Sequence, residues 1–331
     1  MSIENYSNNQ YICKTPVLLI FFNRPDVLSE TFNAIRKAKP SKLYLAQDGA
    51  REGNEEDKEK IEQCKEIVEK IDWECQVFKR YSDSNQGCGK GPYNAINWLF
   101  QNEETAIIIE DDCVASQSFF RFCDEMLEKY FYDTRIFMIT GCNFELQSKE
   151  VTSSYFFGYS GTNWGWATWK RNWLKMDYLC SWTQNQYIFD NLSKMLNYQK
   201  TSKGKQELKN FKETYKKIQN GENISYWDVQ WQAVRYLEHQ LSIIPSKNLI
   251  TNIGLGPTST HAQHKKIPTD FYSEIGKIHF CYNKSYDLDF PLIHPIYVQQ
   301  NYKYDEAIDN KISPSLFKKL MRKLGFEREQ V

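Results

Sequence analysis

The sequence predicts an α/β fold with a doubly wound, mostly parallel sheet flanked by helices. Short apolar runs of strand length alternate with amphipathic helical segments through the first 145 residues. Several of these runs stop abruptly at polar residues, as buried strands do where they reach the edge of a sheet. The apolar run of 105–109 is the clearest case, because three consecutive isoleucines lead directly into Glu110, Asp111 and Asp112.

The elements can be placed in order by their apolar periodicity. Strands of four to eight residues are read from β-branched and aromatic runs, and helices from apolar residues at three- and four-residue spacing. The expected strands are 17–22, 42–47, 76–81, 105–109 and 135–141, and the expected helices are 25–37, 55–71, 93–100 and 117–131.

The regular alternation stops near residue 145, which predicts a change of domain. We assign 14–145 to a nucleotide-binding half and 146–300 to an acceptor and catalytic half, which is rich in tryptophan and strongly helical from 184 to 219. The tail 301–331 is basic and amphipathic over 312–326. It is expected to pack on the domain, with peripheral membrane association through the tail as the alternative.

Composition narrows the classes of function. The 331 residues carry 42 basic and 42 acidic side chains, so the net charge favours no nucleic-acid partner. The polar start of the chain resembles no signal peptide and the apolar runs are too short to span a bilayer, so we expect a cytoplasmic protein, with the inner face of the membrane as the alternative location. The nine cysteines show neither disulfide nor zinc spacing.

The acids after 105–109 are the strongest site candidate. Ligands of open α/β sheets bind beyond the carboxyl ends of the strands, and clustered carboxylates suit Mg²⁺ or Mn²⁺. The alternative is that Asp111 or Asp112 caps the following helix. Other polar residues at strand ends are Arg24, Asp48 and Lys90, the last within the glycine-rich stretch 85–91. That stretch matches no phosphate-binding fingerprint and is expected to be a loop, by itself an ordinary turn.

Taken together, these motifs resemble the GT-A fold glycosyltransferases, in particular the N-acetylglucosaminyltransferase I group and related bacterial sugar transferases. The resemblance extends in order from Pro16 to about His261. It implies that Arg24 binds the donor, that Asp48 contacts uracil, and that Glu110 and Asp111 contact the donor sugar and ribose. In the same motif Asp112 would be the metal ligand, for Mn²⁺ or Mg²⁺.

The resemblance continues into the second half. A Trp-Asp pair supplies the catalytic base in that family, which implies Asp228, with Trp227 beside the donor. A closing loop over the phosphates implies 252–264, with Ser259 and His261 as the candidate contacts among several hydroxyl-bearing neighbours. The alternative for Asp228 is a residue that starts a helix and compensates its dipole.

The function implied is metal-dependent, inverting transfer of a sugar from a UDP-sugar to a hydroxyl of a glycan or glycolipid acceptor, in bacterial surface polysaccharide synthesis. Two alternatives remain. A sugar-1-phosphate nucleotidyltransferase uses a similar fold but usually has a basic glycine-rich loop directly after the first strand, where this chain has Asn23-Arg24-Pro25. A catalytically silent nucleotide-sugar-binding protein would be expected to lack one of the acids.

Overall fold

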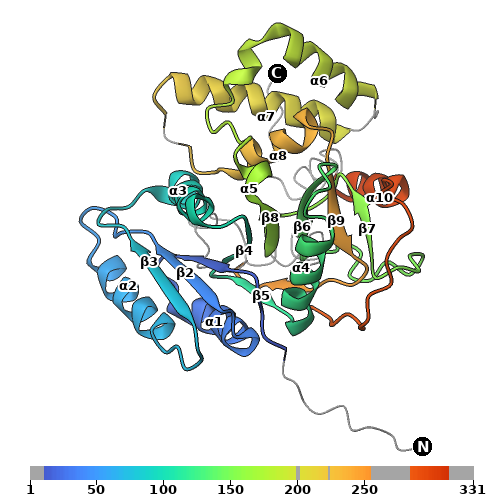
Figure 1. Ribbon diagram of the computed structural model, residues 1–331. Helices are drawn as coiled ribbons and strands as arrows, with labels where there is room; N and C mark the ends of the chain where they lie inside the picture. Colours follow the sequence, from blue (N-terminus) through green and yellow to red (C-terminus); the bar gives the residue numbers. More distant parts are fainter. Residues whose placement is uncertain (1–10, 199–201, 223, 255–283, 313–331) are drawn as a thin grey trace, which may run out of the picture.

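An eight-stranded mixed sheet forms the centre of the computed structural model, which describes residues 11–198, 202–222, 224–254 and 284–312 (Figure 1). The strand order is β3-β2-β1-β4-β8-β6-β9-β7. The strands are β1 (Val17–Phe21), β2 (Lys42–Gln47), β3 (Gln76–Tyr81), β4 (Thr105–Glu110), β6 (Ile136–Thr140), β7 (Tyr155–Gly158), β8 (Trp166–Trp169) and β9 (Leu241–Pro245).

The first four strands are mutually parallel, as the alternation of strands and helices predicts. The remaining strands make the sheet mixed, but six of the eight strands of this sheet run in one direction, which agrees with the prediction of a mostly parallel sheet. Strand β8 runs antiparallel to both β4 and β6, and β7 runs antiparallel to β9. Pattern alone cannot give these directions, because a strand buried on both faces reads as the same apolar run in either orientation.

Helices cover both faces of the sheet, because alternate side chains of each strand point to opposite faces. In β4, Ile107 and Ile109 pack with α1 (Pro25–Ala38), α2 (Glu55–Val68) and α4 (Gln117–Lys129). On the other face, Ala106 and Ile108 pack with α3 (Gly87–Asn102), α5 (Lys170–Trp173) and α8 (Asp228–Leu237). The buried Trp166, Trp173 and Trp231 belong to this second core, and Trp169 to the first.

A helical layer stands over one end of the sheet (Figure 1). It consists of the 3₁₀-helix η1 (Ser181–Gln184), α6 (Gln186–Tyr198), α7 (Ser202–Gln219) and α8. Leu192, Leu196 and Phe211 pack there against Tyr236 of α8. The predicted helical region of 184–219 therefore contains two α-helices, α6 and α7, which pack on one side of α8.

The two halves assigned from sequence share a single sheet. Strands β7, β8 and β9 follow residue 145, yet they complete the sheet begun by β1 to β4. Strand β10 (Ile250–Asn252) pairs with β5 (Cys113–Ala115), which directly follows the acids. The free edge of β4 explains this arrangement, because its backbone groups need partners and β8 provides them.

Part of the predicted tail packs on the sheet. Helix α10 (Tyr302–Ile312) lies next to β7, and the carboxylate of Asp305 accepts hydrogen bonds from the backbone N–H groups of Tyr159 and Ser160 at 2.9 Å. Residues 313–331 lie outside the described part of the chain, and so does most of the predicted amphipathic stretch. Within the ranges described, no helix is both long and apolar enough to cross a membrane.

Candidate functional site

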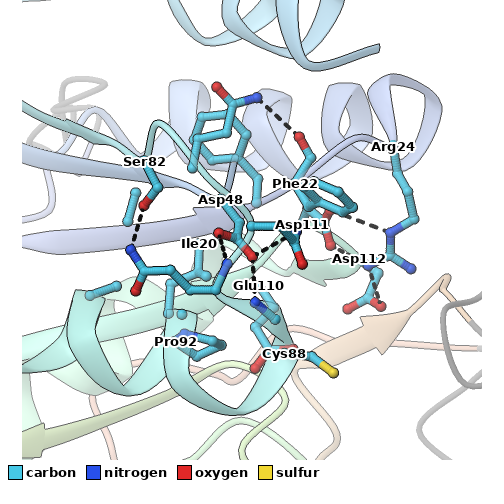
Figure 2. Close-up of a pocket in the computed structure, with 18 of the residues that line it drawn as sticks. Ile20, Phe22, Arg24, Asp48, Ser82, Cys88, Pro92, Glu110, Asp111 and Asp112 are labelled. Carbon is cyan, nitrogen blue, oxygen red and sulfur yellow. Dashed lines mark hydrogen bonds and ion pairs between the residues drawn. The ribbon is translucent and has the colours of Figure 1, made fainter. Parts of the chain in front are cut away.

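A cavity of about 450 Å³ lies at the carboxyl ends of β1, β2 and β4 (Figure 2). Chain order reverses there, because β2 and β3 continue from one side of β1 while β4 lies on its other side. Such a switch point is where open α/β sheets bind ligands, since the loops on either side turn in opposite directions. Arg24, Asp48, Glu110, Asp111 and Asp112 all line this cavity, so the structure brings these predicted residues together.

Arg24 and the two aspartates form one ion-paired group (Figure 2). The guanidinium donates to both carboxylate oxygens of Asp111, and its Nη2 also lies 3.0 Å from Oδ2 of Asp112. Asp111 is almost fully buried, and burial raises its pKa while Arg24 opposes this effect. Arg24 therefore compensates carboxylates that would otherwise repel one another, and Asp112 is the more exposed of the two.

Asp48 has a structural function that the sequence did not reveal. Its Oδ1 accepts the N–H groups of Gly49 and Gln86, and its Oδ2 accepts the N–H of Gly87 and the side-chain amide of Asn85, at 2.8 to 3.0 Å. A carboxylate has about four acceptor positions, so these donors occupy all of them. Asp48 thus holds the start of α3 against the end of β2.

The glycine-rich stretch is the first part of helix α3, not the expected loop. Gly89 explains its composition, because a Cβ there would lie 2.2 Å from the carbonyl oxygen of Ile224. The Cys88 thiol also donates to the carbonyl of Ser225, 137 residues later, at 3.1 Å. Gly89 therefore lets two backbones touch. Lys90 is exposed and does not line the cavity.

A second cavity of about 410 Å³ adjoins the first. Cys88, Pro92, Glu110 and Trp164 line both cavities. Burial, followed by the nearby charges of Asp112, Asp111 and Asp228, raises the pKa of Glu110 to about 8. Glu110 therefore stands between the two cavities as a carboxyl group that can carry a proton near neutral pH.

Asp228 and Trp227 line the second cavity, not the first. Trp227 is the N-cap of α8 and stacks on Trp166, with ring centroids 5.8 Å apart. Asp228 is the first residue of the helix, which is the position that the alternative, a residue that starts a helix, requires. Its position in the second cavity, which Glu110 also lines, is equally compatible with a catalytic base. That position is determined by the preceding segment 224–226, which packs against Gly89.

The backbone after β10 closes on the metal candidate Asp112. The N–H of Ile253 donates to the Asp112 carbonyl at 2.8 Å, and a Cβ on Gly254 would lie only 2.0 Å from Asp112 Oδ2. Asn252 reaches Oδ1 of the same carboxylate at 3.4 Å. Residues 255–283 lie outside the described part of the chain, so the predicted contacts Ser259 and His261 and most of the predicted loop 252–264 cannot be placed.

The acids suit one kind of metal site. Among the residues described, no three His, Cys, Asp or Glu side chains are placed to hold an ion together. Mg²⁺ typically takes one or two carboxylates from the protein and its other ligands from water and substrate phosphates. The partly exposed Asp112, at the cavity wall beside two further carboxyls, fits such a site and does not fit an all-protein cage.

Sequence reasoning missed two cations of the first cavity. Arg51 pairs with the buried Asp57 and lies over the ring of Phe22, 5.7 Å from its centroid. Arg80 lies near the end of β3, and its side chain makes no hydrogen bond or ion pair within the described ranges. It lines the cavity together with Arg51. Both arginines could have been identified from the sequence, because they lie near the ends of predicted strands, and Arg24 and Asp48 were chosen by that same criterion.

No protein-family model matches the chain, and no curated protein matches it. Among solved structures, the inositol-1-phosphate CTP transferase from T. maritima aligns with a TM-score of 0.38 and 11% identity, over 80% of this chain and 96% of that one. A UDP-glucose pyrophosphorylase complexed with UDP-glucose aligns with a TM-score of 0.25 and 8% identity, over 49% of this chain and 71% of that one. These weak likenesses are to nucleotidyltransferases, and they assign the chain to no family.

Proposed function

We propose that the protein is a metal-dependent glycosyltransferase of GT-A type, which transfers a sugar from a UDP-sugar to a hydroxyl of a glycan or glycolipid acceptor. The observation that carries this proposal is the pair of adjoining cavities, one lined by strand-end acids and arginines, the other by aromatic rings and Asp228. Two substrates that must react need two sites that meet, and here they meet at Glu110.

The first cavity is the proposed donor site. Arg24, Arg51 and Arg80 supply positive charge for a diphosphate, and Phe22 presents a ring face to a planar base. Asp112 is the residue that would hold Mn²⁺ or Mg²⁺, which when bound supplies Lewis-acid stabilisation of the diphosphate leaving group. Asp48 contributes by fixing α3 at the edge of this site, since its acceptor positions are already used.

The second cavity is the proposed acceptor site. The rings of Trp164, Tyr226 and Trp227 offer apolar faces of the kind on which sugars stack. Asp228 would accept the proton of the acceptor hydroxyl as its oxygen bonds to the anomeric carbon and the bond from that carbon to UDP breaks. Attack from the side opposite UDP inverts the anomeric configuration, which agrees with the donor and acceptor sites lying on different sides of Glu110.

The direct test is release of UDP from a panel of UDP-sugars, with and without Mn²⁺, in the absence of acceptor. Slow, metal-dependent UDP release with at least one UDP-sugar, absent in Asp112→Ala, is expected. Calorimetry of UDP with wild-type protein provides the binding control. Failure of UDP and every UDP-sugar to bind in the presence of Mn²⁺ would refute the proposal.

A sugar-1-phosphate nucleotidyltransferase is the second candidate, favoured by an unpaired arginine in the second cavity that would suit a phosphate-bearing second substrate. The two functions give different products. UTP with a sugar 1-phosphate would yield pyrophosphate from a nucleotidyltransferase and nothing from a glycosyltransferase, and the UDP-release assay gives the opposite outcome. Running both assays on one preparation decides between them.

A further inference from the structure

The second cavity contains a buried cation with no counter-ion in direct contact among the described residues. Arg235 of α8 is 1% exposed, and its Nε and Nη1 have no hydrogen-bond partner in the described part of the chain. Within the same ranges, the only hydrogen bond of the guanidinium runs from Nη2 to the Tyr236 hydroxyl, at 3.4 Å. The guanidinium also lies over the rings of Tyr236 and Phe137, 4.9 and 6.0 Å from their centroids. Such burial is unfavourable unless something satisfies the charge, because the guanidinium has lost water and gained only one hydrogen bond and these ring contacts.

The position of Arg235 on α8 relates it to the proposed base. Asp228, Gln232 and Arg235 are spaced i, i+4, i+7, so they lie along one face of the helix, and all three line the second cavity. Seven residues of helix rise about 10 Å. The backbone of Arg235 is therefore about two helical turns from that of Asp228, the residue that is proposed to take the proton.

Other polar atoms of this cavity also lack protein partners. Oδ1 of Asn163 and Oε1 of Gln232 are buried without a hydrogen bond in the part of the chain described. The carboxylate of Glu207 instead accepts from the Tyr236 hydroxyl, at 3.3 Å. Unsatisfied donors and acceptors in a cavity that is also lined by aromatic rings indicate a site built for an oxygen-rich ligand.

We infer that the second substrate carries an oxyanion, a carboxylate or a phosphate, which Arg235 binds in the second cavity. This rests on the proposed function of the second cavity as the acceptor site. Arg235 is then a specificity-determining residue and takes no part in the chemistry.

Thermal stability provides the first test. Arg235→Met leaves an apolar side chain beside Phe137 and Tyr236, over whose rings the guanidinium lies, and removes the buried charge, so the melting temperature should stay the same or rise. Arg171→Met is the matched control. Arg171 also lies over an aromatic ring, but it donates to the carbonyls of Phe131, Tyr130 and Asp133, so its loss should lower the melting temperature by several degrees. A comparable drop in Arg235→Met would show that Arg235 is structural and overturn the inference.

Ligand binding provides the second test. Inorganic phosphate, glucuronate and neutral glucose are titrated at matched ionic strength into wild type, Arg235→Met and Arg235→Lys, with saturating UDP and Mn²⁺ to fill the first cavity. At least one oxyanion should bind wild type about tenfold or more tightly than Arg235→Met, with Arg235→Lys between them and glucose unaffected. The preferred probe distinguishes a carboxylate from a phosphate. Equal binding of both oxyanions by wild type and Arg235→Met would refute the inference.

The outcome is separable from that of the proposed function. Arg235 does not line the first cavity, so UDP binding with Mn²⁺ should be unchanged in Arg235→Met. If wild type does not bind UDP, the glycosyltransferase proposal fails, and the oxyanion titrations repeated without nucleotide still report on Arg235. If UDP binds and no oxyanion distinguishes the variants, only the present inference fails.

Discussion

Asp57 is expected to hold the loop between β2 and α2, and Asp57→Asn tests this from the structure. The Asp57 side chain is 1% exposed and accepts from the N–H, Nε and Nη2 of Arg51 and from the amide of Asn23, at 2.7 to 3.1 Å. These four donors are divided equally between its two oxygens. Because Asn retains one oxygen, two of the four donors lose their acceptor.

The size of the effect follows from those two bonds. A hydrogen bond to a charged group contributes about 1.5–3 kcal/mol, and Arg51 is 46% exposed, so water recovers part of the loss. We expect the free energy of unfolding to fall by about 2–4 kcal/mol, which lowers the melting temperature by about 5–10 °C. UDP affinity should fall as well, because Arg51 lines the first cavity.

Urea unfolding at pH 7 and pH 3 measures both the magnitude and its electrostatic origin. Hydrogen bonds from Arg51 lower the pKa of Asp57 below its ordinary value of about 3.9. A lowered pKa in the folded state means that the stabilisation is complete above that ordinary value and is lost as the pH falls through the folded-state pKa. The difference between wild type and Asp57→Asn should therefore be smaller at pH 3 than at pH 7.

Glu56→Gln serves as the control, since Glu56 is 70% exposed and its one ion pair within the described ranges is with Lys60 on the same helix. Its loss should change the free energy of unfolding by less than about 0.5 kcal/mol. A loss in Asp57→Asn no larger than in this control, or a difference that is as large at pH 3 as at pH 7, would refute the reasoning.

Three further substitutions test the proposed chemistry. Asp112→Ala should abolish metal-dependent UDP binding without unfolding the protein, because one partly exposed carboxylate adds little stability; calorimetry with unchanged manganese dependence would remove Asp112 from the metal site. Asp228→Asn should bind UDP-sugar and Mn²⁺ about as well as wild type yet transfer at least roughly 10²-fold more slowly, whereas turnover within a few-fold of wild type would leave Asp228 as a helix-start residue only. Gly254→Ala would place a Cβ 2.0 Å from Asp112 Oδ2. We therefore expect weaker metal-dependent UDP binding, measured by calorimetry, and a free energy of unfolding lower by about 1–3 kcal/mol, measured by urea unfolding. Unchanged values of both would show that the segment after β10 can move aside.

The sequence by itself determined the first half of the sheet and the strand-end part of the site. The apolar run 105–109 lies in β4, which extends one residue further to Glu110, and the predicted strands 42–47 and 76–81 are β2 and β3 with the predicted bounds. Local apolar pattern suffices here because each strand packs against helices that lie next to it in the chain, although β3, at the edge of the sheet, is only partly buried. Arg24, Asp48 and the three acids converge because carboxyl ends of neighbouring parallel strands share one edge of the sheet.

Only the tertiary structure decided what depends on contacts between distant segments. The stretch 87–91 has the composition of a loop, yet it is helical, and its Gly89 lies against the backbone of 224–226. Asp48 is a plausible ligand contact in sequence, but four donors from neighbouring loops use its oxygens. Arg235 gave no signal at all, since a charge is unremarkable in an amphipathic helix until helices from elsewhere in the chain enclose it. The sequence pattern reports the structural preference of each segment. Which side chains are buried, and which of their polar atoms find hydrogen-bond partners, depends on how the segments pack in the folded protein.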